Sequence, residues 1–174
     1  MERIFVKNIN NVLNVISELR KKLGVGLKVV NNFVTITGEE VKIYDTVRVL
    51  KALEVGFPAN TALLLCDPEF LFETISIKSI SRRKNLKEVR ARIIGTEGKT
   101  KRTIESISNC FLKIKDNYVF IIGTAEEVVD AHAALDKLIH GSKQSKVYSY
   151  LERSRRKYKD NIGLLEDLGN DSVD

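Results

Sequence analysis

Two glycines three residues apart, Gly95 and Gly98, stand between two segments of helical periodicity. Neither glycine carries a Cβ atom, so a sugar-phosphate backbone can lie against such a turn without a steric clash. A helix is expected to begin near Lys99, and its first N–H groups and dipole favour an anion at the same place. The turn therefore has the chemistry of a phosphate-binding site.

The net charge of +6 is distributed unevenly along the 174 residues. Residues 1–77 carry nine basic and nine acidic side chains, whereas residues 78–115 carry twelve basic and three acidic ones. Residues 116–174 carry eight basic and eleven acidic side chains. Because the whole basic excess surrounds the two glycines, we expect a nucleic-acid backbone as the partner rather than a merely solvated surface.

The segment before the turn places Arg83, Lys87 and Arg90 on one face of a helix that leads to the glycines. An ordinary solvated helix face has the same spacing, but this one points at the turn, so we expect phosphate contacts. Basic side chains that flank the glycines directly are expected to add to them. The candidate RNA-binding residues around the turn are Arg83, Lys87, Arg90, Arg92, Ile94, Gly95, Thr96, Glu97, Gly98, Lys99, Thr100, Lys101 and Arg102.

The chain repeats itself. Residues 27–38 match residues 112–123 at an offset of 85 residues, and the offset persists where Gly56 falls on Gly141. We infer two copies of one unit followed by a C-terminal extension.

The second copy is predicted to run strand (71–77), helix (82–94), Gly-x-x-Gly turn, helix (99–109), hairpin (112–123) and a helix that ends at Gly141. The first copy offers a strand at 4–7, one helix through residues 12–23, then its own hairpin and helix, so its opening helix is missing or very short. This pattern predicts an α+β fold.

This order of elements, with Ile93 and Ile94 directly before the first glycine, resembles the type I KH domain. The resemblance implies two tandem type I KH-like domains, each a three-stranded sheet covered by helices, plus a C-terminal helix. It also implies a groove in which the turn clamps about four nucleotides of single-stranded RNA or DNA.

Further segments narrow the resemblance, namely Gly98–Glu105, Ile121–Gly123, Gly141-Ser142, Lys146–Tyr148 and Leu151–Arg153. They are similar to the two-KH-domain rRNA-processing family of archaea and eukaryotes. The resemblance implies single-stranded rRNA near the small-subunit 3′ end as ligand, and the endonuclease that matures this end and the translation initiation factor 2 alpha subunit as protein partners. Rival hypotheses are a KH adaptor in RNA decay or messenger RNA regulation, and a protein-docking scaffold with a vestigial groove.

Two departures from the family pattern matter. Archaeal relatives usually carry Lys at the first variable position of the turn, where this chain has Thr96 followed by Glu97, so weaker binding is expected. In the first copy, the offset of 85 places Asn10–Leu13 where the turn should be, and no glycine stands there. We therefore expect the first unit to serve as a brace or a protein-docking surface.

Leu112, Lys113, Ile114 and Lys115 alternate along the first strand of the second hairpin. In KH domains this strand forms the groove wall opposite the turn, so all four are candidates for base contact. Alternatively, Leu112 and Ile114 face the core and the lysines face water. The alternation alone leaves both open.

The expected division is a degenerate KH-like domain at 1–69, an RNA-binding KH domain at 70–141, a basic helix at 142–160 and an acidic, flexible tail at 161–174. We expect free buried thiols at Cys66 and Cys110, a satisfied histidine at His132, and no cofactor, metal or catalytic activity, because no known catalytic or ligand spacing occurs. The longest aliphatic run, residues 62–66, is too short to span a membrane, so a cytoplasmic location is expected.

Overall fold

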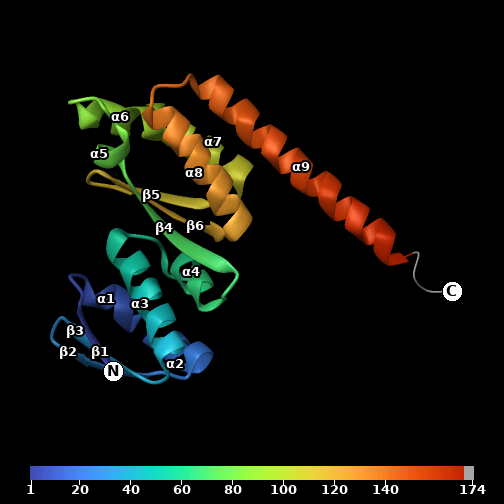
Figure 1. The fold of residues 1–174 in the computed structure, drawn as a ribbon. Helices are drawn as coiled ribbons and strands as arrows, with labels where there is room; N and C mark the ends of the chain where they lie inside the picture. The colour runs from blue at the N-terminus through green and yellow to red at the C-terminus, as the bar shows by residue number, and fades with distance from the viewer. Residues whose placement is uncertain (171–174) are drawn as a thin grey trace.

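The computed structural model describes residues 1–170, with side chains as far as Tyr158. It contains two units of similar topology followed by one long helix (Figure 1). The first unit lies in blue to cyan, the second in green to orange, and the long helix extends from the second unit (Figure 1).

The first unit is a three-stranded antiparallel sheet with helices on one face. Its elements are β1 (Glu2–Phe5), α1 (Ile9–Leu13), α2 (Ile16–Leu23), β2 (Gly26–Val30), β3 (Phe33–Thr37) and α3 (Glu40–Val55). The sheet order is β1-β3-β2. A short helix, α4 (Ala59–Ala62), and a 3-10 turn, η1 (Leu63–Cys66), lead to the second unit.

The second unit repeats this order with an additional 3-10 turn. Its elements are β4 (Phe70–Ser76), α5 (Ile77–Ile80), α6 (Leu86–Ile94), η2 (Thr96–Gly98), α7 (Lys99–Ser108), β5 (Phe111–Lys115), β6 (Tyr118–Thr124) and α8 (Ala125–Ile139). The sheet order, β4-β6-β5, is that of the first unit. The predicted α+β fold with two three-stranded sheets is confirmed.

The repeat extends to the backbone dihedrals. Residues with positive φ recur in pairs at the spacing of 85, namely Gly24 and Asn109, Asn31 and Asp116, and Gly56 and Gly141. The first pair ends α2 and α7 in the left-handed conformation, which is how many helices stop. The second pair forms the hairpin turns, where Asn and Asp tolerate positive φ better than other side chains. The two units therefore share turn geometry as well as topology.

The second sheet is covered on both faces, because successive side chains of β6 point to opposite faces and both sets are apolar. In β6, Val119 and Ile121 face the core of their own unit, whereas Ile122, which is fully buried, joins the core of the first unit. On that outer face the rings of Phe72 and Phe120 stack at 6.0 Å, and Phe57 from the first unit meets Phe72 edge-on at 6.4 Å. The layers are therefore sheet, helices, sheet and helices (Figure 1).

Polar contacts reinforce this junction. The Lys115 ammonium donates to the Glu54 carbonyl at the end of α3 at 3.0 Å. The Arg48 guanidinium lies 3.1 Å from the Asp45 carboxylate and also donates to the Phe70 carbonyl, where β4 begins. The start and the edge of the second sheet are thus tied to α3.

The long helix α9 (Gln144–Asn170) packs on α7 and α8 through Val147 and Leu151, both almost completely buried. It then extends away from the second unit (Figure 1). The sequence predicted a helix end near residue 160, but α9 continues to Asn170. The predicted tail has no proline before residue 170, and Gly163 costs only about 1 kcal/mol in a helix. Residues 171–174 lie outside the described part.

Two predicted helices have different bounds in the structure. The segment 82–94 becomes helical only at Leu86, because the Asn85 side chain accepts the Glu88 N–H at 3.3 Å and caps the helix there. The single helix predicted through residues 12–23 is divided into α1 and α2 at Asn14 and Val15. The opening helix of the first unit is therefore present and very short.

The remaining polar predictions concern three side chains. Cys110 is buried and Cys66 is half-buried, and both are free thiols. Burial raises the pKa of the Cys110 thiol to about 12 and also raises the pKa of Cys66, so neither is a reactive thiolate near neutral pH. His132 is partly buried, and its Nδ1 lies 2.9 Å from the Glu73 carboxylate. Within residues 1–170, no helix is long and apolar enough to cross a membrane.

The double-sided burial of β6 predicts a difference between two adjacent isoleucines. Ile121→Ala and Ile122→Ala should each lower the free energy of unfolding by about 2–5 kcal/mol, because each removes a fully buried side chain. Only Ile122→Ala should accelerate amide hydrogen exchange in α3, since Ile122 packs in the first core. Equal exchange in α3 for the two variants would contradict the proposed packing between the units.

Candidate nucleic-acid interface

The Gly-x-x-Gly turn has a backbone that ordinary residues rarely adopt. Gly95 follows α6 with φ 74° and ψ 174°, a region occupied almost only by glycine. Glu97 and Gly98 then both take left-handed values, with φ of 51° and 75°. Two consecutive left-handed residues reverse the chain sharply, so that α7 can begin at Lys99.

The two glycines are required for different reasons. A Cβ atom on Gly95 would lie 2.2 Å from the Thr100 hydroxyl and 2.7 Å from the Thr100 backbone nitrogen, so no side chain fits. A Cβ atom on Gly98 would have no neighbour within 4 Å. Gly95 therefore allows the chain to fold back against α7, whereas Gly98 leaves an open surface that a ligand backbone can approach.

The open side of the turn is electropositive. Gly98 is the N-cap of α7 and offers no side-chain cap to the first N–H groups of that helix. Lys99 is exposed beside it. Arg102 donates to the Glu97 carbonyl across the turn at 2.8 Å, which holds its guanidinium near the loop. These groups surround the place where a phosphate can contact Gly98.

One carboxylate connects α7 to the edge strand. The Glu105 side chain accepts the Leu112 N–H of β5 at 2.8 Å and also pairs with the Lys101 ammonium at 2.8 Å. Lys101 is therefore partly neutralised within the protein and is less available to a phosphate than Lys99. On the other side, Arg90 of α6 donates to the Asp116 carbonyl in the β5–β6 turn at 2.7 Å. The candidate groove has α6, η2 and α7 as one wall and β5 with its turn as the other.

The apolar groove residues differ in accessibility. Ile94 is 38% exposed at the end of α6, and Ile114 is half-buried on β5, so both can contact a flat base. Leu112 is only 2% exposed and belongs to the core of the second unit. The apolar side chains of Leu112 and Ile114 therefore lie on the face of the sheet that the helices cover.

The lysines of the same strand lie on the opposite face of the sheet. Lys115 donates to Glu54, and the Lys113 side chain approaches Gly56, where a Cβ atom would lie 3.1 Å from the lysine Cε. Both side chains therefore point toward the first unit and away from the groove. Strand alternation separates them from Ile114.

The predicted basic stripe before the turn is divided in the structure. Lys87 and Arg90 share one face of α6 with Ile94, but Arg83 precedes the helix and cannot belong to that face. Arg83 pairs with Glu88 at 3.2 Å. Its guanidinium and that of Arg92 lie 3.3 and 3.6 Å from the position of a Cβ atom on Gly141. The prediction of one continuous stripe is therefore wrong for Arg83.

The sequence did not predict the positioning roles of two residues, Glu105 and Gln144. The Gln144 side chain at the start of α9 donates to the buried Thr100 hydroxyl at 2.7 Å. Neither residue belongs to a recognisable motif. Glu105 is four residues after Lys101, which indicates only a local ion pair, and the contact of Gln144 depends on the tertiary position of α9.

Residues 71–156 match the family model for the second KH domain of PNO1, described as Eukaryotic type KH-domain (KH-domain type I). A KH domain-containing protein of Methanocaldococcus jannaschii is 35% identical over 154 residues, which cover 84% of this chain and 67% of that protein. The chain belongs to the PNO1-type KH-domain family.

Eukaryotic members of the family are longer. The RNA-binding protein pno1 of Drosophila pseudoobscura is 36% identical over 59% of this chain and 44% of its own length. The pre-rRNA-processing protein pno1 of Aspergillus oryzae is 29% identical over 75% of this chain and 50% of its own length. The chain thus spans about half the length of these curated relatives.

The fold is also that of solved relatives. The crystal structure of a complex of a/eIF2alpha, aDim2p and rRNA from Pyrococcus horikoshii contains a chain with a TM-score of 0.77 and 25% identity, covering 90% of this chain and 94% of that chain. The PNO1-type KH fold therefore extends over most of this chain, beyond the residues that the family model matches.

The different surroundings of the two glycines predict different costs of substitution. Gly98→Ala should lower the free energy of unfolding by about 1–2 kcal/mol, the cost of a left-handed residue with free space around it. Gly95→Ala should lower it by more, because Thr100 must move as well. Urea unfolding measures both. Equal destabilisation would show that Thr100 does not fill the space at Gly95.

Proposed function

We propose that this chain binds single-stranded precursor rRNA near the small-subunit 3′ end and acts as a ribosome assembly factor. The observation that carries the proposal is the open turn at Gly98, where no side chain caps α7, in the most basic part of the chain. Two accessible isoleucines accompany it, Ile94 directly before the turn and Ile114 on β5. A KH groove needs this combination, a bare backbone for the phosphates and an apolar surface for the bases.

Each wall of the groove has its own task. The N–H groups at the start of α7, with Lys99, Arg102 and Lys87, hold the phosphates. The bases stack on Ile94 and Ile114, while Arg90 fixes the far end of the groove through Asp116. Glu97 lies exposed in the turn and opposes the phosphate charge, so moderate affinity with a strong dependence on salt is expected.

The mechanism requires no bond to be made or broken by the chain itself. It holds the rRNA segment in a single-stranded form and presents it to the endonuclease that matures this end. The rRNA complex of the Pyrococcus relative supports the alpha subunit of translation initiation factor 2 as a further partner. These encounters are proposed for the cytoplasm.

The first unit is proposed as a brace. Where α1 meets α2, Val12 at the end of α1 and Val15 in the link are almost completely buried, in place of an open glycine turn. Residues 1–77 carry no net charge. The unit instead covers the outer face of the second sheet through Phe57, which stabilises the strands on which the groove is built.

One substitution in the turn tests the groove. Thr96→Asp adds a negative charge where a phosphate must lie, and it should weaken binding of a pyrimidine-rich RNA oligonucleotide at least tenfold, about 1.4 kcal/mol. Thr96→Lys should strengthen it. Fluorescence anisotropy at fixed salt measures both affinities.

The matched control is Asn11→Asp, which changes the net charge equally at the position that corresponds to Thr96 in the first unit. It should leave the affinity unchanged. If Thr96→Asp binds like the unmodified chain, the groove is not the RNA site. If crosslinking in cells recovers mainly non-ribosomal RNA, the groove stands but the role in ribosome assembly does not.

A further inference from the structure

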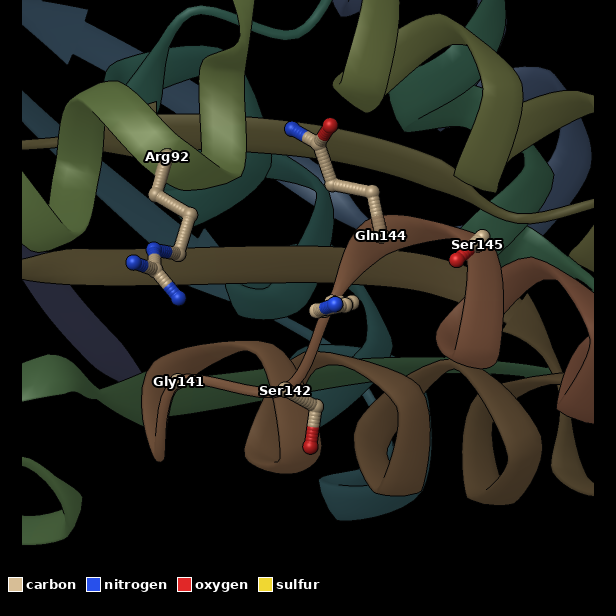
Figure 2. Close-up of a pocket in the computed structure, with 6 residues that line it drawn as sticks. Arg92, Gly141, Ser142, Gln144 and Ser145 are labelled. Carbon is tan, nitrogen blue, oxygen red and sulfur yellow. The ribbon is translucent and has the colours of Figure 1, made fainter.

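A second concave surface lies next to the turn, on the side of α6 that faces away from the groove. Arg90 and Ile94 point to the groove. Arg92 is two residues from each of them, and this spacing rotates its side chain by about 200° around the axis of α6, to the opposite face of the helix. The hollow that Arg92 enters has a volume of about 590 Å³. It is lined by Arg92, Gly141, Ser142, Lys143, Gln144 and Ser145. In Figure 2, Arg92 extends toward the chain at Gly141, and Gln144 extends from the start of α9 toward α7.

Positive charge converges at this hollow. The guanidinium groups of Arg83 and Arg92 approach the same point, 3.3 and 3.6 Å from the position of a Cβ atom on Gly141. Lys143 lines the hollow together with Arg92, so three cations lie in or next to it. The carboxylate paired with this cluster is Glu88, which is more than half exposed and lies 3.2 Å from Arg83. Three cations against one exposed carboxylate leave a net positive charge that an anion would neutralise.

A purely structural role would be to cap the C-terminus of α8. Backbone groups already do this, because the Gly141 N–H donates to the Leu138 carbonyl and the Ser142 N–H to the Lys137 carbonyl. Among the described residues, no hydrogen bond joins either guanidinium to α8. The donors of Arg92 therefore remain available to a ligand, and the hydroxyls of Ser142 and Ser145 lie in the same lining.

The hollow is connected to the Gly-x-x-Gly turn. Gln144 lines it and donates to the Thr100 hydroxyl at 2.7 Å. Thr100 in turn fills the space beside Gly95. The side chains of Gln144 and Thr100 thus join the lining of the hollow to the turn, so the two surfaces lie close to each other on the second unit.

We propose that this hollow, the α8–α9 pocket, binds a phosphate group of the same RNA strand outside the nucleotides held in the groove. The inference rests on the proposed function and extends the footprint beyond the four or so nucleotides of a KH groove. The planar guanidinium of Arg92 suits a phosphate because it can donate two parallel hydrogen bonds. Lys143 and the serine hydroxyls complete the phosphate environment.

RNA length separates the pocket from the groove in an experiment on the full chain. The unmodified chain should bind an eight-nucleotide pyrimidine RNA more tightly than a four-nucleotide one. Lys143→Glu should remove most of this gain, about tenfold, and leave the affinity for the four-nucleotide RNA within twofold. For the longer RNA, the slope of log K against log salt should be shallower in this variant by about 0.7, which is the effect of one lost phosphate contact on a single strand.

Lys146→Glu is the matched control, because Lys146 is exposed three residues further along the chain in the first turn of α9, carries the same charge and does not line this pocket. Arg92→Gln should reproduce the loss seen with Lys143→Glu, and circular dichroism checks that each variant is folded. The inference is overturned if Lys143→Glu and Lys146→Glu lower the affinity for the longer RNA equally. It is also overturned if Lys143→Glu lowers the affinity for the shorter RNA by the same factor as for the longer one. Failure of the unmodified chain to bind even the four-nucleotide RNA would instead refute the groove.

Discussion

The absence of a side chain at Gly95 is the constraint on which the site depends. Thr100 occupies the space that a Cβ atom would need, so the chain can turn back on itself within a few residues. The buried Thr100 hydroxyl then receives a hydrogen bond from Gln144, which ties the turn to the start of α9. With Gly95 packed inward, Gly98 is left facing outward with nothing near it. The same contact places the α8–α9 pocket beside the turn.

The two units show how one fold supports binding in one copy and structure in the other. In the second unit, the Glu105 carboxylate accepts the Leu112 N–H of the edge strand; at the corresponding position of the first unit, Arg20 donates to the Leu27 carbonyl at 2.6 Å. The hydrogen bond runs in the opposite direction in the two units, yet in each case the side chain pairs with a backbone group of the corresponding edge strand. The decisive difference is the turn, where the first unit buries valines and the second keeps glycines. The outer face of the second sheet then rests on the first unit.

Much of the fold could be predicted from local pattern and from the repeat. The hairpins, the helices that follow them and the positions of Gly56 and Gly141 recur at a constant spacing, and each copy supported the interpretation of the other. Helix ends were less predictable where a single polar side chain decides them. Asn85 caps α6 and moves Arg83 out of the helix, although the charges alone suggested one continuous stripe.

The Gly-x-x-Gly turn of the candidate site could be predicted from the sequence, but the surroundings of the turn could not. Glycine spacing and clustered charge identify residues 95–102 from the sequence, because the chemistry is local. Strand alternation shows that Ile114 and Lys115 face opposite ways, but not which face meets helices and which meets the other unit. That depends on the packing of Phe72 and Phe120 against the first unit. The approach of Arg83 and Arg92 to Gly141 is likewise tertiary, since residues 83 and 141 are far apart in the chain.

The central claim is that single-stranded RNA lies along the turn of the second unit alone. The most direct measurement is an NMR titration of isotope-labelled full chain with a short pyrimidine-rich RNA. The account predicts that the largest amide shifts fall between Gly95 and Arg102 and along β5, with little change between Asn8 and Leu19. Shifts concentrated in the first unit around Asn10–Leu13, with the glycine turn unaffected, would contradict it.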